Sequence, residues 1–169
     1  MPTIDLDKFC RCSTDGRVML PITIGEYCYA TDGRIAVRLP HADAPDFPVI
    51  TAHDESFYWL VVTLFDQFVP ENLASIPPHE TPVEKECPSC KGKGRLNWGS
   101  ALPTPCAYCG GYGTRPVAVA IGNTHVSSRY LALIESLPGI RADFSNSGLD
   151  VPISFSFDGG IGLLMGMRA

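Results

Sequence analysis

Apolar residues in the first half of the chain recur at spacings that predict short helices and strands. Leu6 and Phe9 fall on one helical face, whereas Ile35, Val37 and Leu39 are two residues apart, as in a half-buried strand. The bulky run in 55–68 fits a helix face, although its β-branched centre also suits a strand. The first half is therefore predicted to hold a helix at 4–12, strands at 17–24, 27–30 and 35–39, and a helix at 55–68.

The second half shows the same two periods after a proline-rich connector at 72–82. Ser127 or Ser128 can cap a helix that ends at Pro138-Gly139. Asp158-Gly159-Gly160 is typical of a hairpin turn. The predicted elements are a strand at 114–122, a helix with the core face Tyr130, Leu133, Ile134 and Leu137, and strands at 140–145, 151–157 and 161–167.

A weak internal similarity links the two halves of the chain. Residues 32–39 and 158–165 each consist of a glycine turn followed by an alternating apolar strand. Two related halves would produce this match, and hairpin chemistry alone would produce it as well.

Two copies of one cysteine motif stand between these halves. Cys87-Pro-Ser-Cys90-Lys-Gly-Lys-Gly is followed nineteen residues later by Cys106-Ala-Tyr-Cys109-Gly-Gly-Tyr-Gly. Two such pairs at this spacing are typical of a structural zinc site, in which four thiolates surround the metal tetrahedrally. We expect one structural Zn²⁺ per chain, bound by Cys87, Cys90, Cys106 and Cys109. A redox dithiol and free thiols are the alternatives.

Both copies of the motif resemble the Cys-x-x-Cys-x-Gly-x-Gly repeat of DnaJ-type co-chaperones. That family has four such repeats and two zinc ions, whereas this chain has two repeats. The resemblance covers residues 85–115, and the chain has no His-Pro-Asp tripeptide of a J-domain. It implies a zinc module, and it raises the alternative of a protein–protein adaptor.

The charge of the chain is unevenly distributed. Residues 85–115 contain five basic residues and one acidic residue, Glu86, whereas the whole chain has a net charge of −5. Such a module can bind anions, or its lysines can be merely solvated. Its interleaved basic and aromatic residues suit base stacking and phosphate contact, although aromatic rings also pack over zinc sites. The candidate binding residues are Lys91, Lys93, Arg95, Trp98, Tyr108, Tyr112 and Arg115.

Composition favours a folded protein of modest size. The chain has 169 residues, 45% hydrophobic residues and 18% charged residues, which suits one domain with a small inserted module. The longest apolar stretch, at 57–65, is too short for a bilayer, which requires about 20 residues. With no leader pattern at its start, the chain is expected to be cytoplasmic, where thiols stay reduced.

Two segments of the C-terminal part form a further pattern, namely residues 127–138, with Tyr130-Leu131, and residues 152–168, with Met165-Gly-Met-Arg168. They resemble the C-terminal end of bacterial DNA polymerase sliding clamps. The hairpin at 30–36 is similar to hairpins of the same family. The resemblance implies an α+β fold, a clamp-like domain of two β-α-β-β-β halves. Ring closure would require several copies, because a clamp protomer has three such domains and this chain has room for one.

The sequence contains none of the common catalytic motifs. It contains no His-Glu-x-x-His, no Gly-x-Ser-x-Gly and no phosphate-binding glycine loop. Cys10, Cys12 and Cys28 suit buried or free thiols better than a second thiol cluster. His41, His53, His79 and His125 are scattered and are expected to lie on the surface or in loops.

The sequence thus predicts a non-enzymatic zinc-binding protein with no membrane association. Its domains are expected at 1–84 and 116–169, the two halves of a clamp-like body, and at 85–115, an inserted zinc-binding hairpin module with four cysteines. The expected partner is nucleic acid or a protein of DNA replication or recombination, and a homo-oligomer is compatible with the resemblance.

Overall fold

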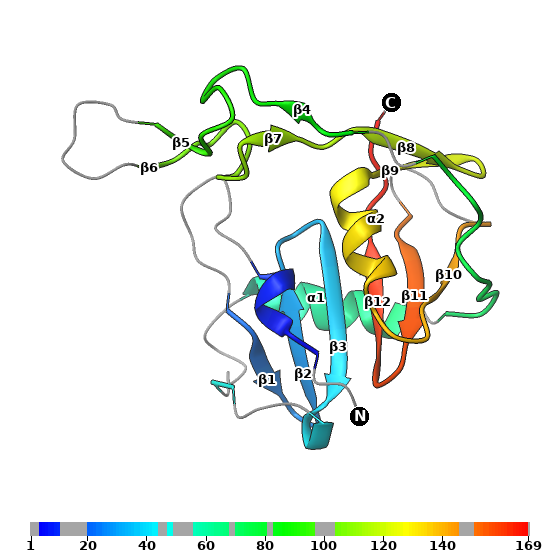
Figure 1. Ribbon diagram of the computed structural model, residues 1–169. Coiled ribbons are helices and arrows are strands. Elements are labelled where there is room, and N and C mark those ends of the chain that lie inside the picture. The colour runs from blue at the N-terminus through cyan, green and yellow to red at the C-terminus, as the bar shows by residue number, and fades with distance from the viewer. Residues whose placement is uncertain are drawn as a thin grey trace.

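A six-stranded antiparallel sheet forms the body of the computed structural model, which describes residues 4–10, 20–43, 47–48, 56–67, 70–80, 83–96, 104–145 and 151–168. Two three-stranded meanders meet where β3 pairs with β12 at the centre of the sheet (Figure 1). The predicted α+β class is therefore confirmed. The order across the sheet is β1 (Ile22–Ile24), β2 (Tyr27–Thr31), β3 (Ile35–Pro40), β12 (Gly160–Leu164), β11 (Ile153–Phe157) and β10 (Arg141–Asp143).

Both predicted aspartate–glycine turns are present at the tips of the hairpins. The side chain of Asp32 accepts hydrogen bonds from the backbone N–H groups of Arg34 and Ile35, at 2.9 and 3.1 Å. Its second carboxylate oxygen accepts the hydroxyl of Tyr130 at 2.6 Å, which ties the turn to helix α2 (Ser128–Glu135). Asp158 occupies the matching turn between β11 and β12.

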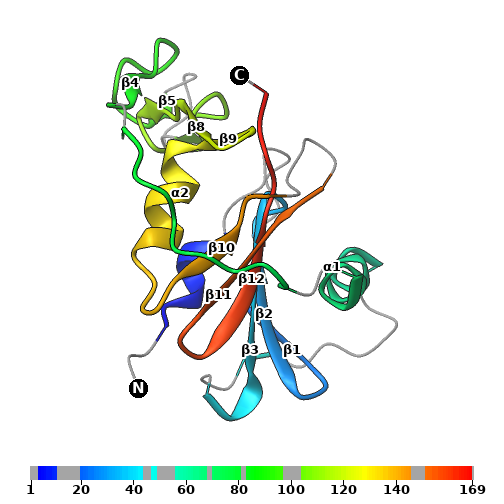
Figure 2. The same cartoon turned by 90° about the vertical axis from the view of Figure 1, so that its right-hand side faces the viewer.

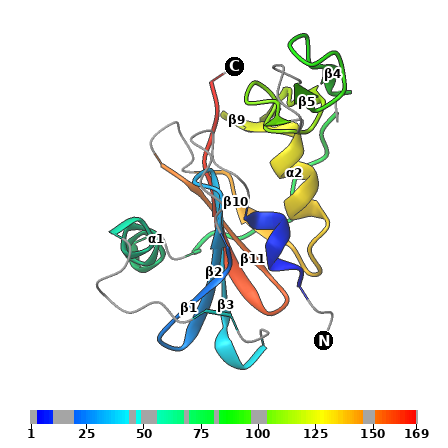
Figure 3. The same ribbon diagram turned by 90° about the vertical axis from the view of Figure 1, so that its left-hand side faces the viewer.

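Helices cover both faces of the sheet. Helix α1 (Ser56–Gln67) lies on one face, and α2 lies on the other beside the short 3₁₀ helix η1 (Leu6–Phe9) (Figures 2 and 3). The larger core joins η1, α2 and the sheet, and the smaller core joins Val61 and Phe65 of α1 to the opposite face. The helix interpretation of 55–68 is thus confirmed, and the predicted helix at 4–12 is shorter than expected.

Strand β3 was predicted to be half-buried, but residues on both of its faces are buried. Ala36, on the face that was expected to be polar, is buried under α1. The guanidinium of Arg38 lies 4.6 Å from the ring centroid of Tyr27 and 5.1 Å from that of Phe65, and 3.7 Å from Asp66. The charge of Arg38 is accommodated on this face because two aromatic rings and a carboxylate surround its guanidinium.

The predicted strand at 114–122 is divided at Pro116. It forms β7 (Thr114–Arg115) and β8 (Ala118–Ile121), since proline has no N–H to continue a strand ladder. Strand β8 pairs with β9 (Thr124–Ser127), which the sequence analysis did not predict. The strand that precedes α2 thus lies in a separate hairpin and not in the six-stranded sheet.

The start of α2 also differs from the expectation. Neither serine caps the helix through its side chain: Ser127 Oγ has no hydrogen-bond partner among the described residues, and Ser128 Oγ accepts the backbone N–H of Val117 at 3.0 Å. The core face includes Leu131, which was not predicted, together with the predicted Ile134. Among the described residues, no helix is long and apolar enough to cross a membrane.

The cysteine module projects from the start of α2, away from the sheet (Figure 1). Two short ladders build it: β4 (Lys85–Glu86) pairs with β7, and β5 (Arg95–Leu96) pairs with β6 (Thr104–Pro105). The 3₁₀ segment η2 (His41–Asp43) lies at the other end of the body, after β3.

Candidate metal centre

The four motif cysteines converge on one point in the interior of the module. All four side chains are at most 5% exposed, and their sulfur atoms lie within 4.8 Å of one another. The Sγ atoms of Cys87 and Cys106 are 3.9 Å apart, and those of Cys90 and Cys109 are 3.7 Å apart. Tetrahedral thiolates at ~2.3 Å from one zinc would be separated by about 3.8 Å, so the quartet fits a single Zn²⁺.

Each copy of the motif is completed by the other. The backbone N–H of Cys87 donates to the carbonyl of Gly113, and that of Cys106 donates to the carbonyl of Gly94, both at 2.8 Å. Within each copy, the N–H of the last glycine also donates to the second cysteine sulfur, at 3.2 Å to Cys90 and 3.3 Å to Cys109. Such donors stabilise the negative charge of metal-bound thiolates.

Gly94 and Gly113 explain why the motif needs glycine at its last position. Both residues adopt positive φ, 69° and 83°. A Cβ atom at Gly94 would lie 2.3 Å from the carbonyl oxygen of Gly111, and one at Gly113 would lie 2.3 Å from that of Gly92. Any side chain would therefore separate the two copies and pull the sulfurs apart.

The remaining cysteines and histidines form no second metal cluster among the described residues. Cys10 and Cys28 are buried in the main core, and burial raises the pKa of the Cys10 thiol to about 11. They therefore match the expectation of buried thiols. His79 lies in a loop, as expected, and its ring nitrogens are 3.0 Å from the Pro77 carbonyl oxygen and 3.4 Å from a carboxylate oxygen of Glu135. Cys12 and His53 lie outside the described residues.

The predicted binding residues do not all lie on the same surface. Five of them are exposed on the module, namely Lys91, Lys93, Arg95, Tyr108 and Arg115. The guanidinium of Arg115 lies 4.9 Å from the ring centroid of Tyr108. Tyr112 instead faces the body of the protein, and Trp98 lies outside the described residues.

Tyr112 belongs to a polar contact that attaches the module to α2. The guanidinium of Arg129 lies 3.3 Å from the Tyr112 ring centroid, and its Nη2 is 2.9 Å from a carboxylate oxygen of Glu84. The same nitrogen donates to the carbonyl of Thr114 at 3.1 Å, and the hydroxyls of Thr114 and Ser128 donate to Glu84. We call Glu84, Tyr112, Thr114, Ser128 and Arg129 the docking cluster.

Glu84 is the common acceptor of the docking cluster. Burial raises its pKa, but hydrogen bonds from Arg129, Thr114 and Ser128 outweigh burial, so the pKa lies below its usual value of 4.5. The stabilisation is therefore complete above that pH and is lost as the pH falls through the lowered folded-state pKa. Sequence analysis missed Glu84, because nothing local distinguishes it from the neighbouring Glu80 and Glu86.

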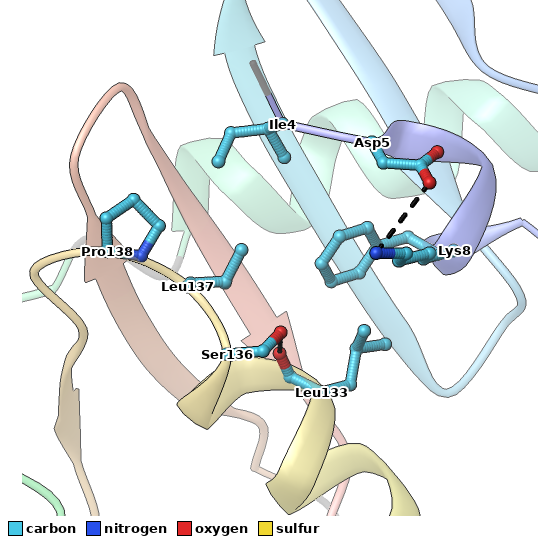
Figure 4. Close-up of a pocket in the computed structure, with 8 residues that line it drawn as sticks. Ile4, Asp5, Lys8, Leu133, Ser136, Leu137 and Pro138 are labelled. Carbon is cyan, nitrogen blue, oxygen red and sulfur yellow. Dashed lines mark hydrogen bonds and ion pairs between the residues drawn. The ribbon is translucent and has the colours of Figure 1, made fainter. Parts of the chain in front are cut away.

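A separate cavity of about 160 Å³ lies between η1 and the end of α2 (Figure 4). Apolar residues such as Phe9 and Leu137 line it. Its polar groups are already paired: Lys8 contacts Asp5 at 3.8 Å, and the Ser136 hydroxyl donates to the Leu133 carbonyl at 2.6 Å. Small-molecule sites usually measure about 300–1,000 Å³, so this cavity is a poor candidate for a substrate site.

Comparisons with protein-family models, with curated proteins and with solved structures gave no match. Function is therefore inferred from the residues and geometry of this chain.

Replacement of Cys90 by serine should remove zinc from the module, because one of four thiolates is lost. We expect elemental analysis to give about one zinc per wild-type chain and close to none for Cys90→Ser after dialysis against a mild chelator. Cys10→Ser is the control and should keep its zinc. A wild-type protein without zinc, or Cys90→Ser with a full complement, would contradict the assignment.

Replacement of Arg129 by alanine should detach the module from α2 while the zinc remains bound. Hydrogen bonds to charged groups contribute about 1.5–3 kcal/mol each, so we expect a loss of roughly 1–3 kcal/mol in unfolding free energy. Hydrogen exchange should accelerate at the amide of Ser128, which is bonded to Val117 O at 2.8 Å.

Two further variants control the docking experiment. Arg129→Lys keeps the charge but loses the planar contact with Tyr112, and it should be intermediate. Lys8→Ala removes an exposed charge elsewhere and should change stability by less than about 0.5 kcal/mol. Unchanged stability and exchange in Arg129→Ala would show that the docking cluster does not hold the module.

Proposed function

We propose that this protein is a non-enzymatic, zinc-stabilised nucleic-acid-binding protein that acts in DNA replication or recombination. The single observation that carries the proposal is the charge of the module. Within the described part of the chain, none of its five cations forms an ion pair, whereas Arg38 and Arg129 in the body do. These module cations are Lys85, Lys91, Lys93, Arg95 and Arg115.

The position of Lys85 and Arg115 supports an anionic ligand. The two residues are direct register partners in the β4–β7 ladder. Like charges at directly opposite positions destabilise a strand pair, and a bound phosphate would relieve that repulsion. The Zn(Cys)₄ group carries about −2, but its charge is buried among the cysteines, so it offsets only part of the excess.

The body supports the resemblance to sliding clamps only in part. Two antiparallel meanders meet at β3 and β12, and each follows a helical segment, η1 or α2, on the same face of the sheet. This arrangement suits two related halves of a clamp-like domain. The body carries few basic residues on α2, so we assign nucleic-acid contact to the module and not to encirclement by a ring.

A protein–protein adaptor is the second candidate function. An open hollow on the module is lined mainly by apolar groups, including Leu96, Pro105 and Ala107, and it could accept an apolar side chain. This role would agree with the resemblance of the module to that of DnaJ-type co-chaperones. In either role the protein would act in the cytoplasm, where its thiols stay reduced.

Nucleic-acid binding should weaken steeply as salt concentration rises, because phosphate neutralisation releases counterions. We expect fluorescence anisotropy with a labelled DNA to show a linear fall of log K with log salt. Lys93→Gln should reduce that slope by about 0.7–0.9, the contribution of one phosphate contact. Lys8→Gln, a matched loss of charge on the body, should leave the slope unchanged.

Zinc content is measured for each variant, so that a loss of affinity can be distinguished from a loss of fold. Salt-independent binding, or a wild-type slope in glutamine variants of every module cation, would count against the proposal. Binding of an unfolded polypeptide that is insensitive to Lys93→Gln would favour the adaptor.

A further inference from the structure

The aromatic ring of Tyr108 is displayed at the tip of one cysteine turn. It lies between Cys106 and Cys109, whose sulfurs are fixed in the zinc site, and the residue is 55% exposed. The Arg115 guanidinium lies 4.9 Å from its ring centroid, and the high exposure shows that the guanidinium covers only part of the ring. A tyrosine held by a metal-closed turn loses little freedom when a second planar group stacks on it.

The hollow described above borders this ring. Its volume is about 540 Å³, and Leu96, Thr104, Pro105 and Ala107 line it together with Tyr108. A planar, largely apolar group beside the ring would bury the exposed Tyr108 and the neighbouring apolar atoms together. A nucleobase has this shape, and base–aromatic stacking tolerates every base.

Two cations are neighbours of residues that line the hollow. Arg95 is the register partner of Pro105, which lines the hollow, and Arg115 lies over Tyr108 with Lys85 as its own register partner. An apolar protein side chain would leave these charges without an anionic partner. Phosphates on either side of a stacked base would neutralise them.

From these contacts we propose that the hollow at Tyr108 binds a base of single-stranded nucleic acid, with the flanking phosphates at Arg95 and Arg115. This inference rests on the proposed nucleic-acid function and specifies its ligand. A single strand offers free base faces, whereas the bases of a duplex are stacked on each other. Readout of a duplex requires a helix or strand ribbon in a groove, and the strands of the module are two residues long.

The direct test compares three labelled oligonucleotides on the wild-type, zinc-loaded protein: single-stranded dT12, the same strand with abasic sites throughout, and a 12-base-pair hairpin duplex. Stacking contributes about 1–3 kcal/mol per base, which corresponds to about 5- to 150-fold in affinity. We expect dT12 to bind at least about fivefold more tightly than the abasic strand, and more tightly than the duplex.

Variants of Tyr108 locate the effect. Tyr108→Ala should lower affinity for dT12 by about 5- to 150-fold and leave affinity for the abasic strand unchanged. Tyr108→Phe should retain wild-type affinity because it keeps the ring. Zinc content confirms that the turn is intact. Should Tyr108→Ala lose zinc, the oligonucleotide comparison on the wild-type protein decides the question without it.

The outcomes separate this inference from the proposed function. Equal affinity for dT12 and the abasic strand, or tighter binding of the duplex, would overturn stacking at Tyr108 and leave phosphate-dependent binding intact. A protein that binds none of the three oligonucleotides would overturn both, and the apolar hollow would then fit a protein partner.

Discussion

The convergence of four thiolates on one point is the constraint on which the module depends. Among its described residues, the only buried cluster consists of Cys87, Cys90, Cys106 and Cys109, with Leu96 partly buried against it. Its ladders are two residues long, which is too short to be stable alone. We therefore expect metal binding and folding to be coupled in this part of the chain.

The docking cluster fixes the module against the body of the protein. Arg129 belongs to α2, whose Leu131 and Ile134 are buried in the main core. Because Arg129 contacts Tyr112 and Glu84 together, the zinc site, the module and the core are connected through continuous contacts. The exposed cations and Tyr108 are consequently displayed on a fixed scaffold, which reduces the entropy lost on binding a ligand.

The features that were predicted correctly from the sequence are those determined by residues close together in the chain. The cysteine spacing predicts the quartet, the turn at Asp32 follows from hydrogen bonds between its side chain and the backbone, and the turn at Asp158 is predicted by the two glycines that follow it. Strand β9 was missed although Gly122-Asn123, a two-residue turn signal, stands between β8 and β9. Contacts between distant segments could not be predicted: nothing local shows that Tyr112 lies under Arg129 or that α1 covers Ala36.

The most direct test of this account is X-ray absorption at the zinc edge of the purified protein. A single closed site predicts a first shell of four sulfur atoms at ~2.3 Å, with no nitrogen or oxygen neighbour. A mixed shell with nitrogen or oxygen neighbours would show an open or misassigned site. An oxidised quartet without zinc would remove the scaffold on which the proposed binding surface depends.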